Sequence, residues 1–237
     1  MDERFRRERA LLGADAMEKL SRRRVAVLGL GGVGSWCAEA LARSGVGELI
    51  LCDQDGVSRS NINRQLFAAE STIGRSKAEV AAERVRDINP DCRAVPLVFT
   101  YGADTRETLF SEKPDFVVDA IDLVACKLDL ILTCRERGIG IVSALGTGNK
   151  CDASLLRITD IAKTEGCPLA RVMRKELRRR GVEHLPVVFS PEEPLENEES
   201  ETPPPGRRSV PGSLVWVPAA AGLLLCQHTV SELIKLP

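Results

Sequence analysis

A glycine-rich turn, GLGGVG at residues 29–34, joins an apolar run to a helix-forming stretch. The run from Val25 to Leu28 has no polar residue, which is typical of a buried strand, and the stretch that follows places Trp36, Ala40 and Leu41 on one helical face. Glycine lets the chain turn tightly and approach phosphates, whose charge the helix N-terminus favours. The turn therefore predicts a nucleotide-binding β-turn-α unit. The predicted phosphate contacts are Gly29, Gly31, Gly32 and Gly34.

Strand and helix patterns continue to alternate after this unit. Further strands are predicted at 48–55, 94–99, 115–122 and 140–146, and helices at 76–90 and 124–137. This alternation predicts an α/β, Rossmann-like, doubly wound and mostly parallel sheet. Beyond Gly148 the rhythm ends, and additional C-terminal strands and helices are expected. They comprise a half-exposed strand at 154–161, a basic helix at 168–181 and a buried C-terminal helix.

The 237 residues fit one domain, since α/β folds often exceed the domain prior of roughly 150 residues. We expect a single domain over 1–237, with an N-terminal lead-in helix within 1–24. Residues 191–211 are predicted to form a mobile crossover loop, because their glutamates and prolines bury too little apolar surface to offset the cost of ordering.

Composition excludes several classes of protein. Lys plus Arg number 33 and Asp plus Glu 34, so any nucleic-acid contact must come from a local patch. The longest apolar run, Leu214 to Cys226, contains Pro218 and is well short of the roughly 20 residues that span a bilayer. The charged N-terminus does not resemble a secretory signal. We expect a cytoplasmic protein without a membrane anchor.

Eight cysteines form no CxxC pair, so the sequence predicts no zinc site. In a reducing compartment most of them should be small buried groups. Cys151, in a loop, and Cys167, at a predicted helix N-terminus, are the best candidates for a reactive thiol, although an inert role is the simpler interpretation.

Polar residues follow the second predicted strand. Asp53, at its end, can accept hydrogen bonds from ribose hydroxyls, which is compatible with both NAD and ATP. The cations Arg64 and Lys77 favour a triphosphate, and Asp122, after the fourth strand, could hold Mg²⁺. The competing interpretation is a loop of solvated charges. The remaining cofactor candidates are Asp55 and Asn61.

Several separated motifs, taken together, resemble the adenylating domain of the ubiquitin-activating and molybdopterin- or thiamine-biosynthesis activating enzymes. They are GLGGVGS, LCDQDGVSRSNINRQ at 51–65, GRSKAEVAAERVRDINP at 74–90 and DAID at 119–122. The resemblance covers nearly the whole chain. It implies ATP-dependent activation of a carboxylate as an acyl adenylate.

The same resemblance implies a role for individual residues. Asp53 would bind the ribose, Asn61, Arg64 and Lys77 would surround the triphosphate, and Asp122 would bind magnesium. Arg7 is similar to an arginine that reaches into the partner subunit's site in that family, which would imply a homodimer.

Within that family, residues 145–150, 160–164 and 168–171 look like the tRNA threonylcarbamoyladenosine dehydratase branch. Two departures are Cys167, where an aspartate is expected, and Ser213, near a position where some members carry a cysteine. This branch implies ATP-dependent dehydration and cyclisation of the modified adenosine in tRNA. A sulfur-transfer protein is a possible further partner.

The basic helix is the predicted tRNA contact, because neutralised phosphates release counterions. Its cations are Arg171, Arg174, Lys175, Arg178, Arg179 and Arg180. The competing interpretation is a solvated helix surface. With one Tyr and two Trp, shape and phosphate recognition should outweigh base stacking.

Because the nucleophiles would belong to the substrate, no catalytic Cys, His or Ser is required, and His184 and His228 are interpreted as structural. Three alternatives stay open. The chain could adenylate the C-terminus of a ubiquitin-like sulfur carrier; the missing CxxC pairs and the basic helix count against this. It could be an NAD-dependent oxidoreductase, or a nucleotide-binding RNA-binding protein without catalysis.

Overall fold

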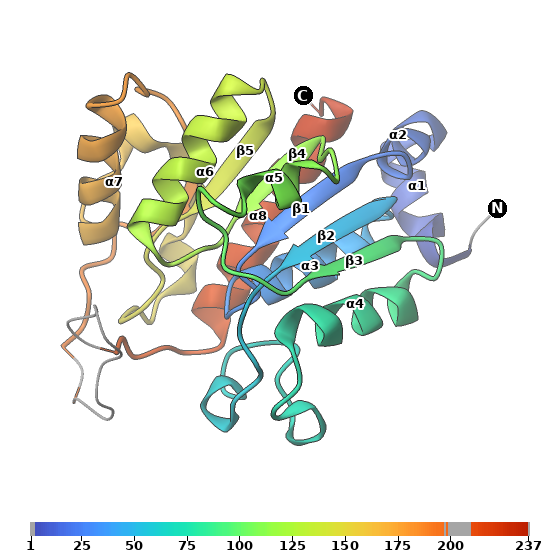
Figure 1. The fold of residues 1–237 in the computed structure, drawn as a ribbon, viewed down its shortest axis with the longest axis horizontal. Coiled ribbons are helices and arrows are strands. Elements are labelled where there is room, and N and C mark those ends of the chain that lie inside the picture. Colours follow the sequence, from blue (N-terminus) through green and yellow to red (C-terminus); the bar gives the residue numbers. More distant parts are fainter. Residues whose placement is uncertain (1–2, 197, 199–209, 237) are drawn as a thin grey trace.

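A seven-stranded sheet runs through the centre of the molecule (Figure 1). The computed structural model describes residues 3–196, 198 and 210–236. The strands are β1 (Arg24–Leu28), β2 (Glu48–Cys52), β3 (Arg93–Leu97), β4 (Phe116–Asp119), β5 (Gly140–Ala144), β6 (Arg157–Asp160) and β7 (Pro186–Phe189). Their order is β3-β2-β1-β4-β5-β7-β6, and only the β6–β7 pair is antiparallel. The predicted mostly parallel, doubly wound sheet is confirmed.

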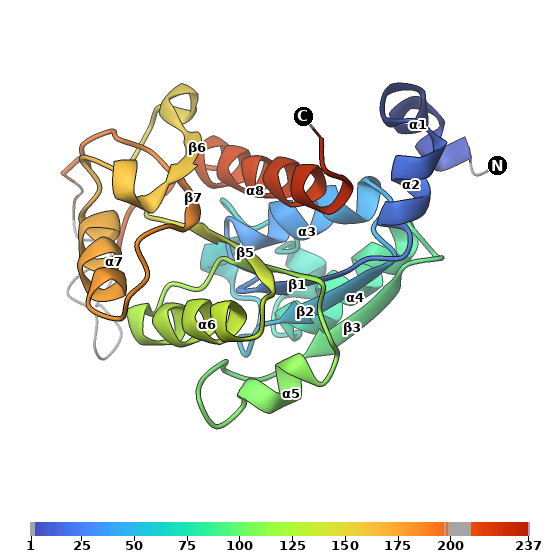
Figure 2. The same ribbon diagram turned by 90° about the horizontal axis from the view of Figure 1, so that it is seen from above.

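Helices cover both faces of the sheet (Figure 2). One layer contains α3 (Gly34–Arg43), α4 (Lys77–Ile88) and α8 (Trp216–Ile234). The other contains α5 (Arg106–Phe110), α6 (Val124–Glu136) and α7 (Pro168–Arg178). The short α5 was not predicted from the sequence. The strands β2 and β3 are added on one side of β1, and β4 and β5 on its other side, so the strand order reverses at β1. At such a switch point, the carboxyl ends of the parallel strands form a crevice.

The apolar run of β1 explains why two helix layers are needed. Val25 and Val27 belong to the core with α3, α4 and α8, whereas Ala26 and Leu28 belong to the core with α5 and α6. Because successive strand side chains point to opposite faces, a strand covered on both sides reads as a continuous apolar run.

The predicted lead-in helix is divided. A 3-10 turn (Glu3–Phe5) and two short helices, α1 (Arg6–Leu12) and α2 (Ala14–Leu20), replace one continuous helix. Gly13 separates them at φ 85°, a left-handed value that glycine adopts at low cost and that a helix cannot contain. The helical composition was interpreted correctly, but the glycine break was missed.

The ends of the predicted crossover loop are attached to the loop after β5. Residues 191–196, 198 and 210–211 are described, and the rest of the predicted loop lies outside the described residues. Leu195 N donates to Asn149 O at 2.7 Å, and Asn149 N donates to Gly212 O at 2.8 Å. Asn149 itself lies in the left-handed region, at φ 57°. One residue therefore holds the chain on both sides of the loop.

Candidate active site

The glycine turn follows β1 and opens α3, as predicted. Gly29 has φ 83°, and a Cβ on it would lie 2.6 Å from Ala120 O. A Cβ on Gly34 would lie 1.8 Å from Gly29 O, whereas one on Gly31 would have Gln65 Nε2 as its nearest neighbour, at 3.9 Å. Gly29 and Gly34 are thus required by the turn itself. Gly31 leaves open space where a phosphate could approach the backbone.

Asp53 is held beside this turn at the end of β2. Its Oδ2 accepts from Leu30 N at 2.7 Å, and its Oδ1 accepts from Asp55 N at 2.8 Å. Burial raises the pKa of the Asp53 carboxyl, and these backbone hydrogen bonds and the Lys77 ammonium oppose that shift. Two fixed donors leave further lone pairs on the carboxylate, so it can still accept from ribose hydroxyls.

Lys77 is the first residue of α4 and is buried at the same edge of the sheet. Its Nζ lies 2.9 Å from Asp55 Oδ2, and its backbone N donates to Asp55 O at 3.0 Å. The Asp55 side chain is 57% exposed. Asp55 is the ion-pair partner of Lys77 in this structure. A triphosphate bound at this edge would therefore share the Lys77 ammonium with Asp55.

The loop between β2 and α4 carries the other predicted polar residues. Asn61 is buried, and its Oδ1 accepts from Ser58 N at 3.2 Å, so its amide supports the loop. Arg64 is half-buried, and its Nη1 donates to Ser60 O at 2.9 Å and to Asn63 Oδ1 at 2.8 Å. The guanidinium therefore has a defined position in this structure.

Two aspartates near the end of β4, Asp119 and Asp122, have different surroundings. Asp122 is exposed in the loop before α6. Asp119 is fully buried, lies 2.9 Å from Lys127 Nζ, and accepts from Ser143 Oγ. Lys127 also donates to Ile121 O at 3.1 Å. Sequence reasoning missed this ion pair; a lysine within the apolar face of a predicted helix was its one available signal.

Arg7 is not brought to this site within one chain. It is exposed on α1, which lies near the amino end of the sheet, away from the loops that carry Asn61 and Arg64 (Figure 1). The predicted site residues at the carboxyl edge are therefore brought together without it.

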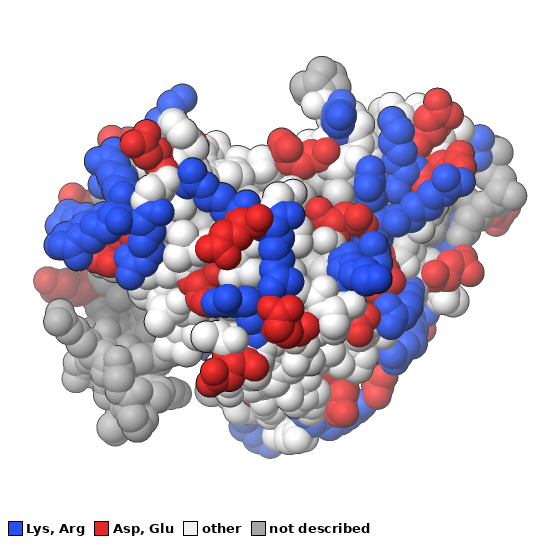
Figure 3. Space-filling model, turned by 45° about the horizontal axis from the view of Figure 1, so that its top comes forward, with Lys and Arg blue, Asp and Glu red and all other residues white. Residues whose placement is uncertain are grey.

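The predicted basic helix, 168–181, is observed as α7 but ends earlier, at Arg178, so Arg179 and Arg180 follow it. The six predicted cations fall into two groups. Arg174 donates to Thr164, and Arg179 and Arg180 contact Glu176. Within the described part of the chain, the side chains of the other three make no hydrogen bond or ion pair and are exposed; they are Arg171, Lys175 and Arg178. Positions separated by four and three residues share one helical face. Figure 3 shows the basic side chains gathered over this part of the molecule.

The two cysteines singled out from the sequence are both poorly suited to react. Cys151 is exposed, but a hydrogen bond from its Sγ to Glu192 Oε1, 3.3 Å away, raises the pKa of the thiol. A reactive cysteine needs a lowered pKa, so the raised pKa of Cys151 agrees with the inert role that the sequence favoured. Cys167 lies directly before α7, as predicted, but is buried.

Lys150 is a buried residue that sequence reasoning left without a role. Its Nζ donates to Ser190 O at 2.8 Å and to Glu192 O at 2.6 Å. Burial lowers the pKa of this ammonium. The side chain therefore fastens the loop after β5 to the chain that leaves β7.

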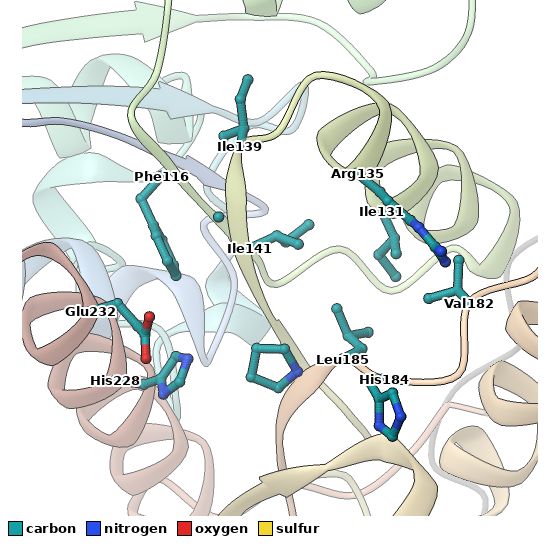
Figure 4. A pocket seen from close by; sticks show the side chains of 12 residues that line it. Phe116, Ile131, Arg135, Ile139, Ile141, Val182, His184, Leu185, His228 and Glu232 are labelled. Atoms are coloured by element: carbon teal, nitrogen blue, oxygen red, sulfur yellow. The ribbon is translucent and has the colours of Figure 1, made fainter. Parts of the chain in front are cut away.

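Both histidines line a pocket of about 380 Å³ at the amino edge of the sheet, away from the glycine turn. In Figure 4, His228 and Glu232 project from α8 on one side, and Arg135 and His184 lie on the other. His228 packs edge to face on Phe116, with ring centroids 6.3 Å apart. The positions agree with the structural interpretation of these histidines.

Among residues 3–196, 198 and 210–236, no group of three or more His, Cys, Asp or Glu side chains could hold a metal ion. In the same residues α8 is long and apolar enough to cross a membrane by length and composition. Half of that stretch is buried in the protein, as in many core helices, so this is weak evidence for a span.

The fold and these polar groups define a nucleotide-binding α/β protein of Rossmann type, with its site at the carboxyl edge of β1, β2 and β4. The chain belongs to the ThiF family, which it matches over residues 5–235.

Relatives in this family match most or nearly all of the chain. The sequence is 40% identical to the tRNA threonylcarbamoyladenosine dehydratase of Bacillus subtilis (strain 168), over 98% of this chain and 94% of that protein. It is 41% identical to the Escherichia coli (strain K12) protein of the same name, over 74% and 66%. The crystal structure of the E. coli dehydratase TcdA in complex with ATP superimposes with a TM-score of 0.88 and 35% identity, over 98% of this chain and 94% of that one.

Proposed function

We propose that this chain catalyses the ATP-dependent dehydration and cyclisation of threonylcarbamoyladenosine in tRNA. The observation that carries the proposal is the fixed Asp53 carboxylate beside an open glycine turn, with Lys77 and Arg64 on the neighbouring loops. It stands on a chain that is similar over nearly its full length to dehydratases, one of them crystallised with ATP.

The chemistry proceeds in two displacements. The carboxylate of the modified adenosine attacks the α-phosphorus of ATP, a P–O bond breaks and pyrophosphate leaves, which gives an acyl adenylate. A nucleophile of the same side chain then attacks the acyl carbon, the bond to AMP breaks and a ring closes. One carboxylate oxygen leaves on AMP and the attacking nucleophile gives up its proton to solvent, so the nucleoside loses the elements of water. The protein contributes chiefly orientation and charge stabilisation.

Each polar group at the carboxyl edge has a part in this scheme. Asp53 accepts from the ribose hydroxyls, and the backbone at Gly31 approaches the phosphates. Lys77 and Arg64 offset the phosphate charge, Lys77 as a point charge and Arg64 as a planar fork. Asn61 acts mainly by supporting the loop that carries Arg64.

Asp122 is the proposed magnesium ligand. Mg²⁺ usually keeps several waters and takes one or two carboxylates together with substrate phosphates, so a single exposed aspartate at this edge fits the ion. Asp119 does not fit that role, because it is buried against Lys127. When bound, the ion supplies charge neutralisation on the phosphates.

A homodimer is part of the proposal. Arg7 is exposed and away from the site of its own chain, which is the position required if it reaches the site of a second copy.

The exposed cations of α7, Arg171, Lys175 and Arg178, are the proposed tRNA phosphate contacts. Such a protein would work in the cytoplasm, where tRNA is found.

Adenylation of a sulfur-carrier protein is the less favoured function, because the dehydratases share almost the whole chain, α7 included. Incubation with ATP, Mg²⁺ and tRNA bearing threonylcarbamoyladenosine, followed by mass spectrometry of the nucleosides, tests the choice. We expect an ATP-dependent loss of one water. An unchanged nucleoside, together with carrier-dependent pyrophosphate exchange, would favour the carrier protein as substrate.

A further inference from the structure

The amide of Asn63 bridges two parts of the chain that are distant in sequence. Its Oδ1 accepts from Arg64 Nη1 at 2.8 Å, and its Nδ2 donates to Ser213 O at 3.1 Å. The two partners fix the orientation of the amide, since the reverse orientation would place two donors together at Arg64 and two acceptors together at Ser213. The predicted ATP-binding guanidinium is thus connected through one side chain to residues 210–216.

Residues 210–216, here called the wall segment, are anchored at their other side to the loop after β5. Gly212 N donates to Asn149 Oδ1 at 2.5 Å, and Trp216 Nε1 donates to Cys151 O at 2.7 Å. The segment therefore runs from the end of β5 to the loop that carries Asn63. It contacts the carboxyl-edge site through the hydrogen bond from Asn63.

The glycine turn also packs against Arg64 and against the start of α8, which follows the wall segment. A Cβ on Gly32 would lie 3.2 Å from Pro218 Cβ and 3.4 Å from Arg64 Cγ. Trp36, on the helix that the turn opens, donates from Nε1 to Arg64 O at 3.2 Å. The turn, Arg64 and the start of α8 are in contact, so a shift of the wall segment would be felt at Arg64.

We propose that Asn63 is a positioning residue that holds the Arg64 guanidinium and couples it to the wall segment, so that ATP binding and the order of the wall segment support one another. This inference rests on the proposed function, because it takes Arg64 as an ATP contact. Coupling of this kind is reciprocal: ATP orders the segment to the same extent that the ordered segment favours ATP.

Two measurements on the full chain test the coupling. The first is the Kd for ATP with Mg²⁺ held constant and without tRNA. The second is deuterium uptake of peptides within 211–217, with and without ATP. Asn63→Leu keeps the approximate shape and removes both hydrogen bonds, Asn63→Ala serves if the leucine variant does not fold, and Asn63→Gln keeps the amide. Ile62→Ala removes an exposed neighbouring side chain and is the matched control.

In the wild type we expect ATP to slow deuterium uptake by the peptides within 211–217. Asn63→Leu should raise the ATP Kd about fivefold, which corresponds to about 1 kcal/mol, and abolish the ATP-dependent slowing. Asn63→Gln should recover part of both effects, and Ile62→Ala should show neither loss. A purely structural Asn63 would leave the slowing intact, and that result overturns the inference.

Two further outcomes separate this inference from the function on which it rests. If the wild type and Asn63→Leu bind ATP with the same Kd, the coupling is contradicted and the proposed function stands. Wild-type protein that binds no ATP overturns the proposed function and the inference with it.

Discussion

Asp119 and Lys127 form an ion pair inside the protein, with Nζ and Oδ2 2.9 Å apart and both side chains fully buried. The carboxylate also accepts from Ile121 N at 3.1 Å and from Ser143 Oγ, so it has donors on both oxygens. Buried charges persist only when paired and hydrogen-bonded. This pair fixes the end of β4 and the beginning of α6, between which Asp122 lies.

Lys127→Met should lower the free energy of unfolding by about 3–5 kcal/mol, because it leaves a buried carboxylate without its counter-charge. Urea denaturation at pH 7 measures the loss. The double variant Lys127→Met/Asp119→Asn should be more stable than the single variant. Lys19→Met, at an exposed position of α2, is the control. A loss below about 1 kcal/mol for Lys127→Met would contradict the role given to the pair.

The glycine turn contains glycines that the fold requires, such as Gly34, and one that faces the proposed ligand, Gly31. Gly34→Ala should prevent normal folding, because its Cβ would overlap Gly29 O at 1.8 Å. Gly31→Ala should fold with an unchanged Tm, since no atom of another loop lies closer than 3.9 Å, and yet weaken ATP binding more than tenfold. Thermal unfolding and ATP titration test both. Normal ATP affinity in Gly31→Ala would count against phosphate binding at this turn.

Asp122→Asn should reduce dehydratase turnover more than tenfold without a change in stability, because the side chain is exposed. If the carboxylate binds Mg²⁺, the variant needs a higher Mg²⁺ concentration for half-maximal activity. The measurement is turnover against Mg²⁺ at fixed ATP. Asp104→Asn removes an exposed acid elsewhere and should behave as wild type. An unchanged Mg²⁺ dependence would remove Asp122 from the metal site.

On α7 the three cations without a partner among the described residues should contribute more to tRNA binding than the paired ones. Replacing Arg171, Lys175 and Arg178 by Gln should weaken binding and reduce the slope of log K against log salt by about one for each phosphate that is no longer neutralised. Arg179→Gln/Arg180→Gln, on cations already held by Glu176, is the comparison. Filter binding at several salt concentrations distinguishes them. Equal effects per charge would show a diffuse surface instead of a defined face.

His228 should make stability depend on pH. Burial lowers its pKa from the ordinary 6.5, against the opposing charge of Glu232. The unfolded chain therefore takes up this proton more readily than the folded one, and the free energy of unfolding decreases as pH falls through 6.5. His228→Gln should flatten this dependence between about pH 7.5 and pH 5 in urea titrations. An unchanged slope in His228→Gln would contradict the role given to this imidazole.

Most of the fold was predictable because its causes are local. The apolar run at β1, the glycines of the turn and the alternation of strand and helix patterns act within a few residues, and the sheet follows from them. The break at Gly13 was equally local, but the helical composition on both sides concealed it. The resemblance to the adenylating family supplied the candidate site residues, which pattern alone could not separate from solvated loop charges.

The amino-acid sequence by itself determined the class of fold, the place of the nucleotide turn and the set of chemical groups on the loops beyond it. The tertiary structure alone decided which of these groups are engaged. Across the described residues it buries Asp119 and exposes Asp122, it gives side-chain partners to three of the six cations at 171–180 and none to the other three, and it joins Asn63 to Ser213. The physical reason is that burial and hydrogen bonding depend on partners far apart in the chain, and these meet only when the whole sheet and its helices have assembled.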